Sequence, residues 1–135
     1  MTKNNKHEIQ HIIEKILQKH NIDPSGEDYF LKLRIPGYDD LVIEKMGEHF
    51  LVGHYYIHPS GDYISDPVFV FEDHQGYWFP VRIELLFGHK FCIFLDAGFR
   101  VIFPDIIKEF ILFQRMFSKN IKDLKFLEIG EEVHD

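Results

Sequence analysis

The chain has 135 residues, of which 45% are hydrophobic and 27% are charged, and its formal net charge is −7. A chain of this length is expected to fold as one domain over residues 1–135 and to bury roughly two-thirds of its unfolded surface, which excludes a largely disordered protein. The acidic charge, without a block of Lys or Arg, argues against direct binding to nucleic acid. One cysteine, Cys92, and no long apolar run predict a cytoplasmic protein without disulfides or membrane contact.

The first predicted element is an amphipathic helix from Glu8 to His20. Asp23-Pro24 marks its end, because a proline disfavours the helical conformation of the residue before it. The apolar side chains recur at the helical spacing and form one stripe, made of Ile9, Ile12, Ile13, Ile16 and Leu17. This stripe is expected to pack on a sheet.

The start of this helix carries the sequence His7-Glu8-Ile9-Gln10-His11, which matches the H-E-x-x-H pattern of zinc metallopeptidases. In those enzymes the two histidines bind zinc and the glutamate acts as a base. At 100° per residue, His7 and His11 lie opposite the apolar stripe. We therefore expect both histidines to face solvent and to bind no metal.

The middle of the chain, from Tyr29 to Phe103, is rich in aromatic and β-branched residues and is interrupted by glycine turns. This composition predicts an antiparallel meander of five to seven strands. Alternation along the later strands predicts a core face, made of Tyr77, Phe79, Val81, Ile83, Leu85, Phe87, Phe91, Ile93, Leu95, Phe99, Val101 and Phe103. The opposite face mixes apolar, aromatic and charged side chains, namely Trp78, Arg82, Glu84, Cys92, Phe94, Arg100 and Ile102.

This mixed face allows two interpretations. A loop or the C-terminal tail could cover part of it, or it could bind a protein partner or a second copy of the chain. Exposed aromatic side chains beside arginine are typical of protein interfaces. On the second interpretation, the binding residues are Trp78, Arg82, Phe94 and Arg100. Cys92 is expected to be a buried side chain and not a nucleophile, because no basic group lies nearby in the sequence.

From Pro104 onward the apolar spacing becomes helical again, and a shorter tail reaches Ile129. Residues 131–135 are expected to fray. The predicted fold is therefore α+β, with an N-terminal helix, an antiparallel β-meander and a C-terminal helix packed on one sheet face.

The richest cluster of polar and aromatic residues lies between His54 and Pro67. One interpretation makes Asp62 and Asp66 caps that accept hydrogen bonds from the backbone of their own turn. The other makes His54, Asp62 and Asp66 ligands of a divalent metal ion. That second interpretation leads to a metal-dependent hydrolase acting on phosphodiesters, with Glu84 as a possible base, although no cationic or glycine-rich phosphate grip accompanies it.

The same segment resembles a known family. The run His54-Tyr55, Gly61-Asp62, Asp66-Pro67, Phe71-Glu72 and Trp78-Phe79-Pro80 is similar to the H-Y, N-G-D, D-P, F-E and W-x-P pattern of an uncharacterised family of small domains of unknown function. Those domains are carried by plasmids, phages and other mobile elements. Here Ser60 replaces the usual asparagine. The resemblance covers about residues 50–80 and implies an accessory protein of a mobile element, without an established activity.

The function we expect is that of a small acidic binding protein that acts on a protein partner or forms a homodimer. Its contact surface would be the mixed sheet face together with the turn from Tyr55 to Asp66, including Tyr56 and Asp62. No cofactor is expected for this function, whereas the alternative hydrolase needs a divalent metal.

Overall fold

The computed structural model describes residues 6–57, 59–61 and 63–134, without the side chains of residues 56, 57, 63–65 and 96. Helix α1 (Glu8–Lys19) comes first, and the chain then forms strands β1 (Tyr29–Arg34), β2 (Leu41–Met46), β3 (His49–Ile57), β4 (Tyr63–His74), β5 (Tyr77–Leu85) and β6 (Gly88–Phe91). After these come a hairpin of β7 (Ile93–Asp96) and β8 (Phe99–Ile102), the long helix α2 (Pro104–Asp123), the short helix α3 (Phe126–Ile129) and strand β9 (Glu131–Glu132).

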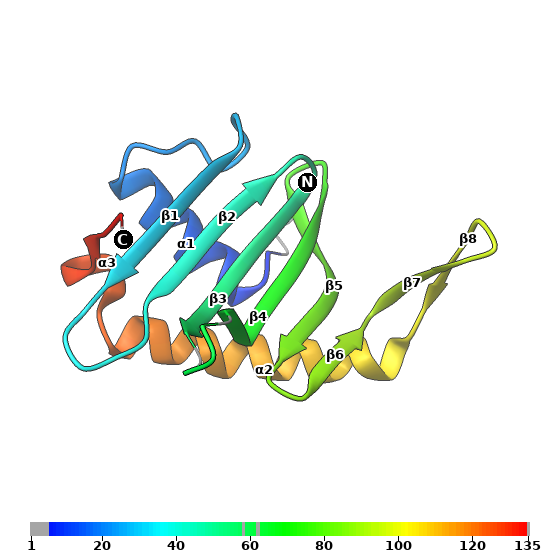
Figure 1. Cartoon of the computed structure of the whole chain (residues 1–135). Helices are drawn as coiled ribbons and strands as arrows, with labels where there is room; N and C mark the ends of the chain where they lie inside the picture. The colour runs from blue at the N-terminus through cyan, green and yellow to red at the C-terminus, as the bar shows by residue number, and fades with distance from the viewer. Residues whose placement is uncertain (1–5, 58, 62, 135) are drawn as a thin grey trace.

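Within the described residues, β1 to β6 and β9 form a seven-stranded antiparallel sheet in the order β6-β5-β4-β3-β2-β1-β9. Helices α1 and α2 lie side by side on one face of this sheet, and the other face is open (Figure 1). The predicted α+β fold is confirmed. No helix in the described part of the chain is long and apolar enough to cross a membrane.

The core lies between the sheet and the two long helices. Phe69 of β4 contacts Phe110 and Phe117 of α2 at centroid distances of 5.3 and 5.1 Å. Phe71 of the same strand contacts Phe110 at 5.2 Å. The predicted stripe of α1 supplies Ile9, Ile13, Ile16 and Leu17 to the core, all fully buried. Alternate residues of a central strand thus meet the helices, as the strand period requires.

A β-bulge in β5 changes which residues face the core. Val70 of β4 pairs with Arg82, but the next residue, Phe71, pairs with Pro80, so β5 carries one extra residue, Val81. Trp78 therefore faces the helices before the bulge, and Ile83 faces them after it. The expected core position of Ile83 is confirmed.

The prediction that Trp78 lies on an exposed partner-binding face is wrong. The side chain is 2% exposed, and its ring stacks on Phe50 of β3 at a centroid distance of 4.3 Å. Tyr77 and Phe79, which were expected in the core, are only half-buried. The extra residue reverses the alternation, because one inserted residue turns every side chain on one side of it to the opposite face.

The second half of the predicted core face also departs from expectation. Phe91, Leu95, Phe99 and Phe103 are exposed instead of buried. In the described part of the chain, β7 and β8 pair with each other and not with the sheet, and their hairpin extends beyond the body of the domain (Figure 1). The base of the hairpin is anchored by the backbone, where the Cys92 N–H donates to the Val81 carbonyl and the Phe103 N–H donates to the Cys92 carbonyl.

The C-terminal segment is ordered where fraying was predicted. Residues Glu131 and Glu132 form β9 and pair with Arg34 and Leu33 of the edge strand β1. The Val133 N–H then donates to the Lys32 carbonyl at 2.9 Å. The prediction of a frayed tail is wrong for residues 131–133, because the open edge of β1 offers unpaired backbone groups that a short strand can satisfy.

Candidate functional site

Exposed apolar side chains are concentrated in residues 86–103, which we name the hairpin arm. This segment contains eight of the fourteen exposed large hydrophobic side chains found among the described residues. Their exposed fractions range from 37% to 96%, and they are Leu86, Phe87, Phe91, Phe94, Leu95, Phe99, Ile102 and Phe103. The arm follows from the local sequence, because Ala97 and Gly98 adopt positive φ and close a tight turn between two short apolar strands.

A shallow apolar groove lies at the base of the arm. It has a volume of about 480 Å³ and is lined by His89, Lys90, Phe91, Phe94, Phe103 and Ile106. Phe91 and Phe94 meet edge to face there at 5.6 Å. An ion pair of 2.7 Å between Lys90 and Glu109 joins β6 to α2 beside this groove.

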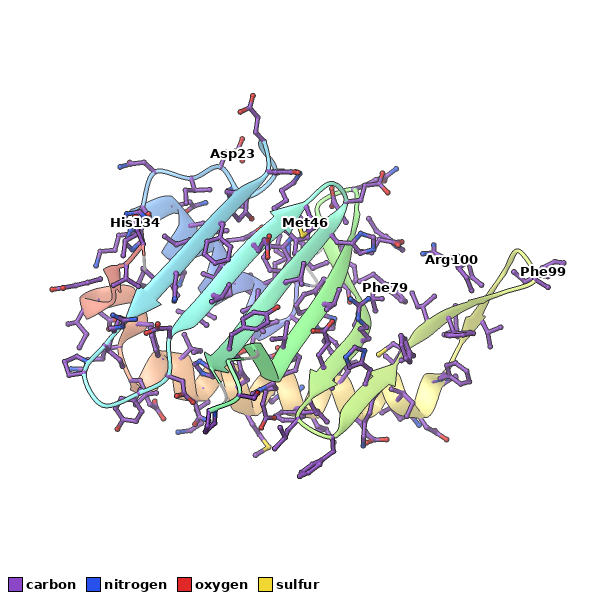
Figure 2. All side chains as sticks on the ribbon, viewed as in Figure 1. Asp23, Met46, Phe79, Phe99, Arg100 and His134 are labelled. Carbon is purple, nitrogen blue, oxygen red and sulfur yellow. The ribbon has the colours of Figure 1, made fainter. Side chains whose placement is uncertain are left out.

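Arg100 ties the arm to the sheet. Its Nη2 atom donates to both carboxylate oxygens of Glu72 on β4, at 2.6 and 2.8 Å, while His74 Nε2 lies 2.8 Å from the same carboxylate. Hydrogen bonds from Arg100 and then from His74 hold the pKa of Glu72 below its ordinary value. Figure 2 shows Arg100 and Phe99 on the projecting hairpin, with Phe99 at the outer end. The predicted binding residues Phe94 and Arg100 thus both belong to the arm.

We predict that Arg100→Ala raises the pKa of Glu72, because the Arg100 hydrogen bond is the largest cause of its lowering. A carboxyl whose pKa is lowered by folding stabilises the fold above its unfolded pKa, and this contribution is lost as the pH falls through the folded pKa. In the wild type, the hydrogen bonds between Arg100 and the Glu72 carboxylate should therefore persist to a pH below 4.5, the ordinary pKa of a glutamate side chain. NMR titration of the Glu72 side chain in both proteins measures the shift. Identical titration curves would contradict the tether, and His74→Gln is the control expected to change the pKa less.

The remaining candidates on the open face are paired within the chain or half-buried. Arg82 donates through Nε to Glu84 Oε2 at 3.0 Å, so the possible base Glu84 is held by its neighbour on the same strand. Tyr55 and Asp66 are half-buried on β3 and β4. The side chain of Tyr56 and the whole of Asp62 lie outside the described residues.

His54 lies on the helix-facing side of the sheet. Its Nδ1 atom is 2.9 Å from the Asp40 carbonyl, and because a carbonyl oxygen can only accept, Nδ1 donates in this contact. The ring packs against Phe117 at 5.2 Å and lines a pocket of about 420 Å³ with Tyr38, Pro67, Phe113, Met116, Phe117, Asn120, Asp123 and Leu124. Among the described residues, no three His, Cys, Asp or Glu side chains form a group that could hold a metal ion. Because Asp62 is outside that set, the metal-site hypothesis stays a prediction.

The two histidines of the H-E-x-x-H sequence have different surroundings. His11 is exposed, as expected. His7, however, is half-buried, and its Nε2 atom lies 2.6 Å from the Tyr77 hydroxyl. Burial lowers the pKa of His7, which favours the neutral ring as a hydrogen-bond partner of Tyr77. His7 thus joins the start of α1 to β5.

The expected burial of Cys92 is confirmed. The side chain is fully buried, and this burial raises the pKa of its thiol to about 12. At neutral pH almost none of it is thiolate, so it is a poor nucleophile.

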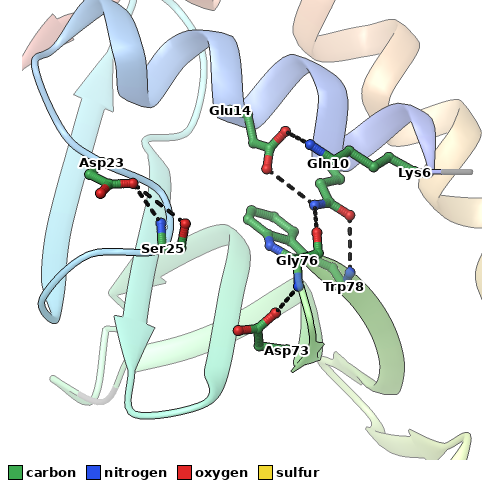
Figure 3. Close-up of polar contacts among 8 residues, drawn as sticks. All are labelled: Lys6, Gln10, Glu14, Asp23, Ser25, Asp73, Gly76 and Trp78. Carbon is green, nitrogen blue, oxygen red and sulfur yellow. Dashed lines mark hydrogen bonds and ion pairs between the residues drawn. The ribbon is translucent and has the colours of Figure 1, made fainter. Parts of the chain in front are cut away.

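Sequence reasoning missed a buried polar contact between α1 and the β4–β5 hairpin. Gln10 is fully buried; its Nε2 donates to the Gly76 carbonyl at 2.7 Å, and its Oε1 accepts from the Trp78 N–H at 3.0 Å (Figure 3). The spacing contained a signal, because Gln10 precedes Ile13 by three residues and Leu17 by seven, on the same side of the helix.

Comparison with known proteins identifies the family but not an activity. No curated protein and no solved structure matches the chain. The family described as domain of unknown function (DUF6908) matches residues 9–127, a range that includes α1 except Glu8, the whole hairpin arm and all of α2. This agrees with the family of unknown function expected from the sequence, whereas the mobile-element setting stays a prediction. Because the match extends over most of the chain, this protein belongs to the DUF6908 family of domains of unknown function.

Proposed function

We propose that this domain is a protein-binding module whose contact surface is the hairpin arm. The observation that carries the proposal is the concentration of exposed phenylalanine, leucine and isoleucine side chains on residues 86–103. Such a concentration of exposed apolar side chains in one segment is unusual on monomers and marks binding sites. Five of the eight side chains are phenylalanines, a residue type enriched at protein interfaces.

The outer end of the β7–β8 hairpin, within the arm, has little apolar packing against the rest of the described chain. A two-stranded hairpin is marginally stable in water unless further strands or another packing surface support it. Leu95 and Phe99 face solvent near the end of the hairpin, where β7 and β8 pair only with each other among the described residues. A partner that covers them would supply the missing apolar contacts.

A protein partner fits the charge of the chain better than a membrane or a nucleic acid. The net charge of −7 opposes approach to anionic lipids and to phosphate backbones. No cofactor is needed for binding of this kind. The setting we propose is the cytoplasm. There the module would act as an accessory protein of a plasmid or phage. Genes of mobile elements next to the gene for this protein would support this role.

Photo-crosslinking in the native cell tests the binding function. A photoreactive phenylalanine analogue at position 99 is expected to capture a protein, because Phe99 is 74% exposed on the arm. Position 30 is the matched control, since Phe30 is 58% exposed on β1 at the other end of the sheet. Equal yields at both positions, or no adduct at position 99, would contradict a binding arm.

A further inference from the structure

We infer that the partner of the hairpin arm is a second copy of this chain, and that the two arms pack antiparallel across a two-fold axis. This inference rests on the proposed binding function of the arm. A two-fold axis places identical surfaces in contact and runs a strand antiparallel to its own copy. Two paired hairpins would form a four-stranded sheet shared by both chains, which meets the need of an isolated hairpin for more strands.

The exposed apolar area of the arm approaches the size of a standard protein interface. The exposed fractions of its five phenylalanines together amount to about three whole side chains. At about 150–250 Å² for each aromatic side chain, they offer roughly 450–750 Å² per copy. Leu86, Leu95 and Ile102 add to this area, since each is at least 42% exposed. Standard interfaces bury about 800 Å² per partner, so the arm alone approaches that size.

The charge distribution permits contact between two arms. The arm contains Lys90, Arg100 and Asp96, so its formal charge is +1 and the rest of the chain carries −8. Lys90 already pairs with Glu109, and Arg100 already pairs with Glu72. Two arms can therefore meet through apolar side chains, and most of the negative charge of each copy stays outside the contact.

The arm also carries both a projecting ring and a groove that could receive it. In an antiparallel arrangement, the outer end of one arm lies beside the base of the other. Phe99 is the most exposed aromatic side chain of β7 and β8, and the groove at the base has apolar walls that include Phe91, Phe94 and Phe103. Its volume of about 480 Å³ is within the range of pockets that hold small organic ligands, so it has room for one ring.

Sedimentation equilibrium of the full chain is the first test. The wild type is expected to have twice the chain mass of 16.1 kDa, and Leu95→Ser with Phe99→Ser is expected to weaken dimerisation at least roughly a hundredfold, since each substitution removes two symmetric anchors. Leu112→Ser with Met116→Ser on α2 is the matched control, because those side chains are 60% and 66% exposed. Dimers that persist in the arm variant would place the interface elsewhere and overturn the inference.

A disulfide experiment tests the arrangement of the arms. Ala97→Cys places a thiol in the turn of the hairpin, His89→Cys places one at the basal groove, and the native Cys92 is buried. Mixing the two variants under mild oxidation should give a disulfide between chains in preference to disulfides between identical variants. Dimers that form no such mixed disulfide would overturn the antiparallel arrangement.

The two proposals fail in different ways. The wild type could be a monomer at roughly 100 times its cellular concentration while position 99 still crosslinks to another protein. In that case the inference that the partner is a second copy is wrong, and the proposed binding function stands. If the wild type is a monomer and position 99 captures nothing, both proposals are wrong.

Discussion

Trp78→Ala is expected to lower the free energy of unfolding by about 3–5 kcal/mol, the usual cost of truncating a buried tryptophan or phenylalanine to alanine. The indole is 2% exposed and stacks on Phe50 at 4.3 Å, with Phe71 at 5.4 Å. Its removal would leave a cavity between three strands, which a close-packed core can fill only in part. Urea denaturation measures the effect as a lower midpoint at an unchanged slope.

Met116→Ala is the control for this experiment. The side chain is 66% exposed on α2, and alanine is a good helix former, so the expected change is within about 0.5 kcal/mol. A loss below about 1 kcal/mol for Trp78→Ala would show that the indole is not buried. Trp78 would then be an exposed aromatic side chain, as the sequence predicts for a residue that contacts a partner.

The position of Trp78 shows where alternation stops being a reliable guide. Hydrophobic periodicity predicted the helices and the antiparallel sheet, because both depend on local spacing. It failed in β5, where one inserted residue reversed the faces. The sequence held a clue in Pro80, because a proline has no N–H for the ladder and is confined in sheets to edges, strand starts and bulges.

The candidate site was predictable in composition but not in position. Phe94 and Arg100 were placed on a partner surface, and both lie on the arm. Alternation also predicted that Leu95 and Phe99 would join the core, because it assumes that each strand stays in the sheet. Whether a short apolar hairpin packs or projects depends on tertiary contacts at its base, such as those of Cys92, and local patterns do not contain them.

The acidic turn shows a different limit of sequence reasoning. Short carboxylates in a turn suit both capping and metal binding, so residue types alone left both interpretations open. The structure places two of the three residues: the Nδ1 of His54 donates to the Asp40 carbonyl and its ring faces α2, and Asp66 is half-buried on β4. Asp62, the residue that would decide between them, lies outside the described part of the chain.

Gln10→Leu is expected to destabilise the fold by roughly 1–3 kcal/mol, although leucine has a similar size and suits a helix. The substitution leaves the Trp78 N–H, whose hydrogen bond is buried, without a partner, and one unpaired buried group costs about 1–3 kcal/mol; the Gly76 carbonyl belongs to an exposed residue, so water can replace its lost partner. The contact joins α1 to the turn between β4 and β5, so hydrogen exchange should accelerate at the Trp78 N–H before it does at β2 or β3. Gln18→Leu is the matched control, because Gln18 is exposed on the same helix and its replacement should change stability by less than about 0.5 kcal/mol.

A second variant, Gln10→Glu, separates packing from hydrogen bonding. The new carboxylate keeps an acceptor for the Trp78 N–H but cannot donate to the Gly76 carbonyl. It also places a second carboxylate beside Glu14, to which Gln10 Nε2 donates at 3.1 Å in the wild type. We therefore expect Gln10→Glu to be at least as destabilising as Gln10→Leu at neutral pH and to recover stability as the pH falls and the new carboxyl becomes protonated. Equal stability of the wild type, Gln10→Leu and Gln10→Glu at every pH would mean that the Gln10 amide does not hold α1 on the β4–β5 hairpin.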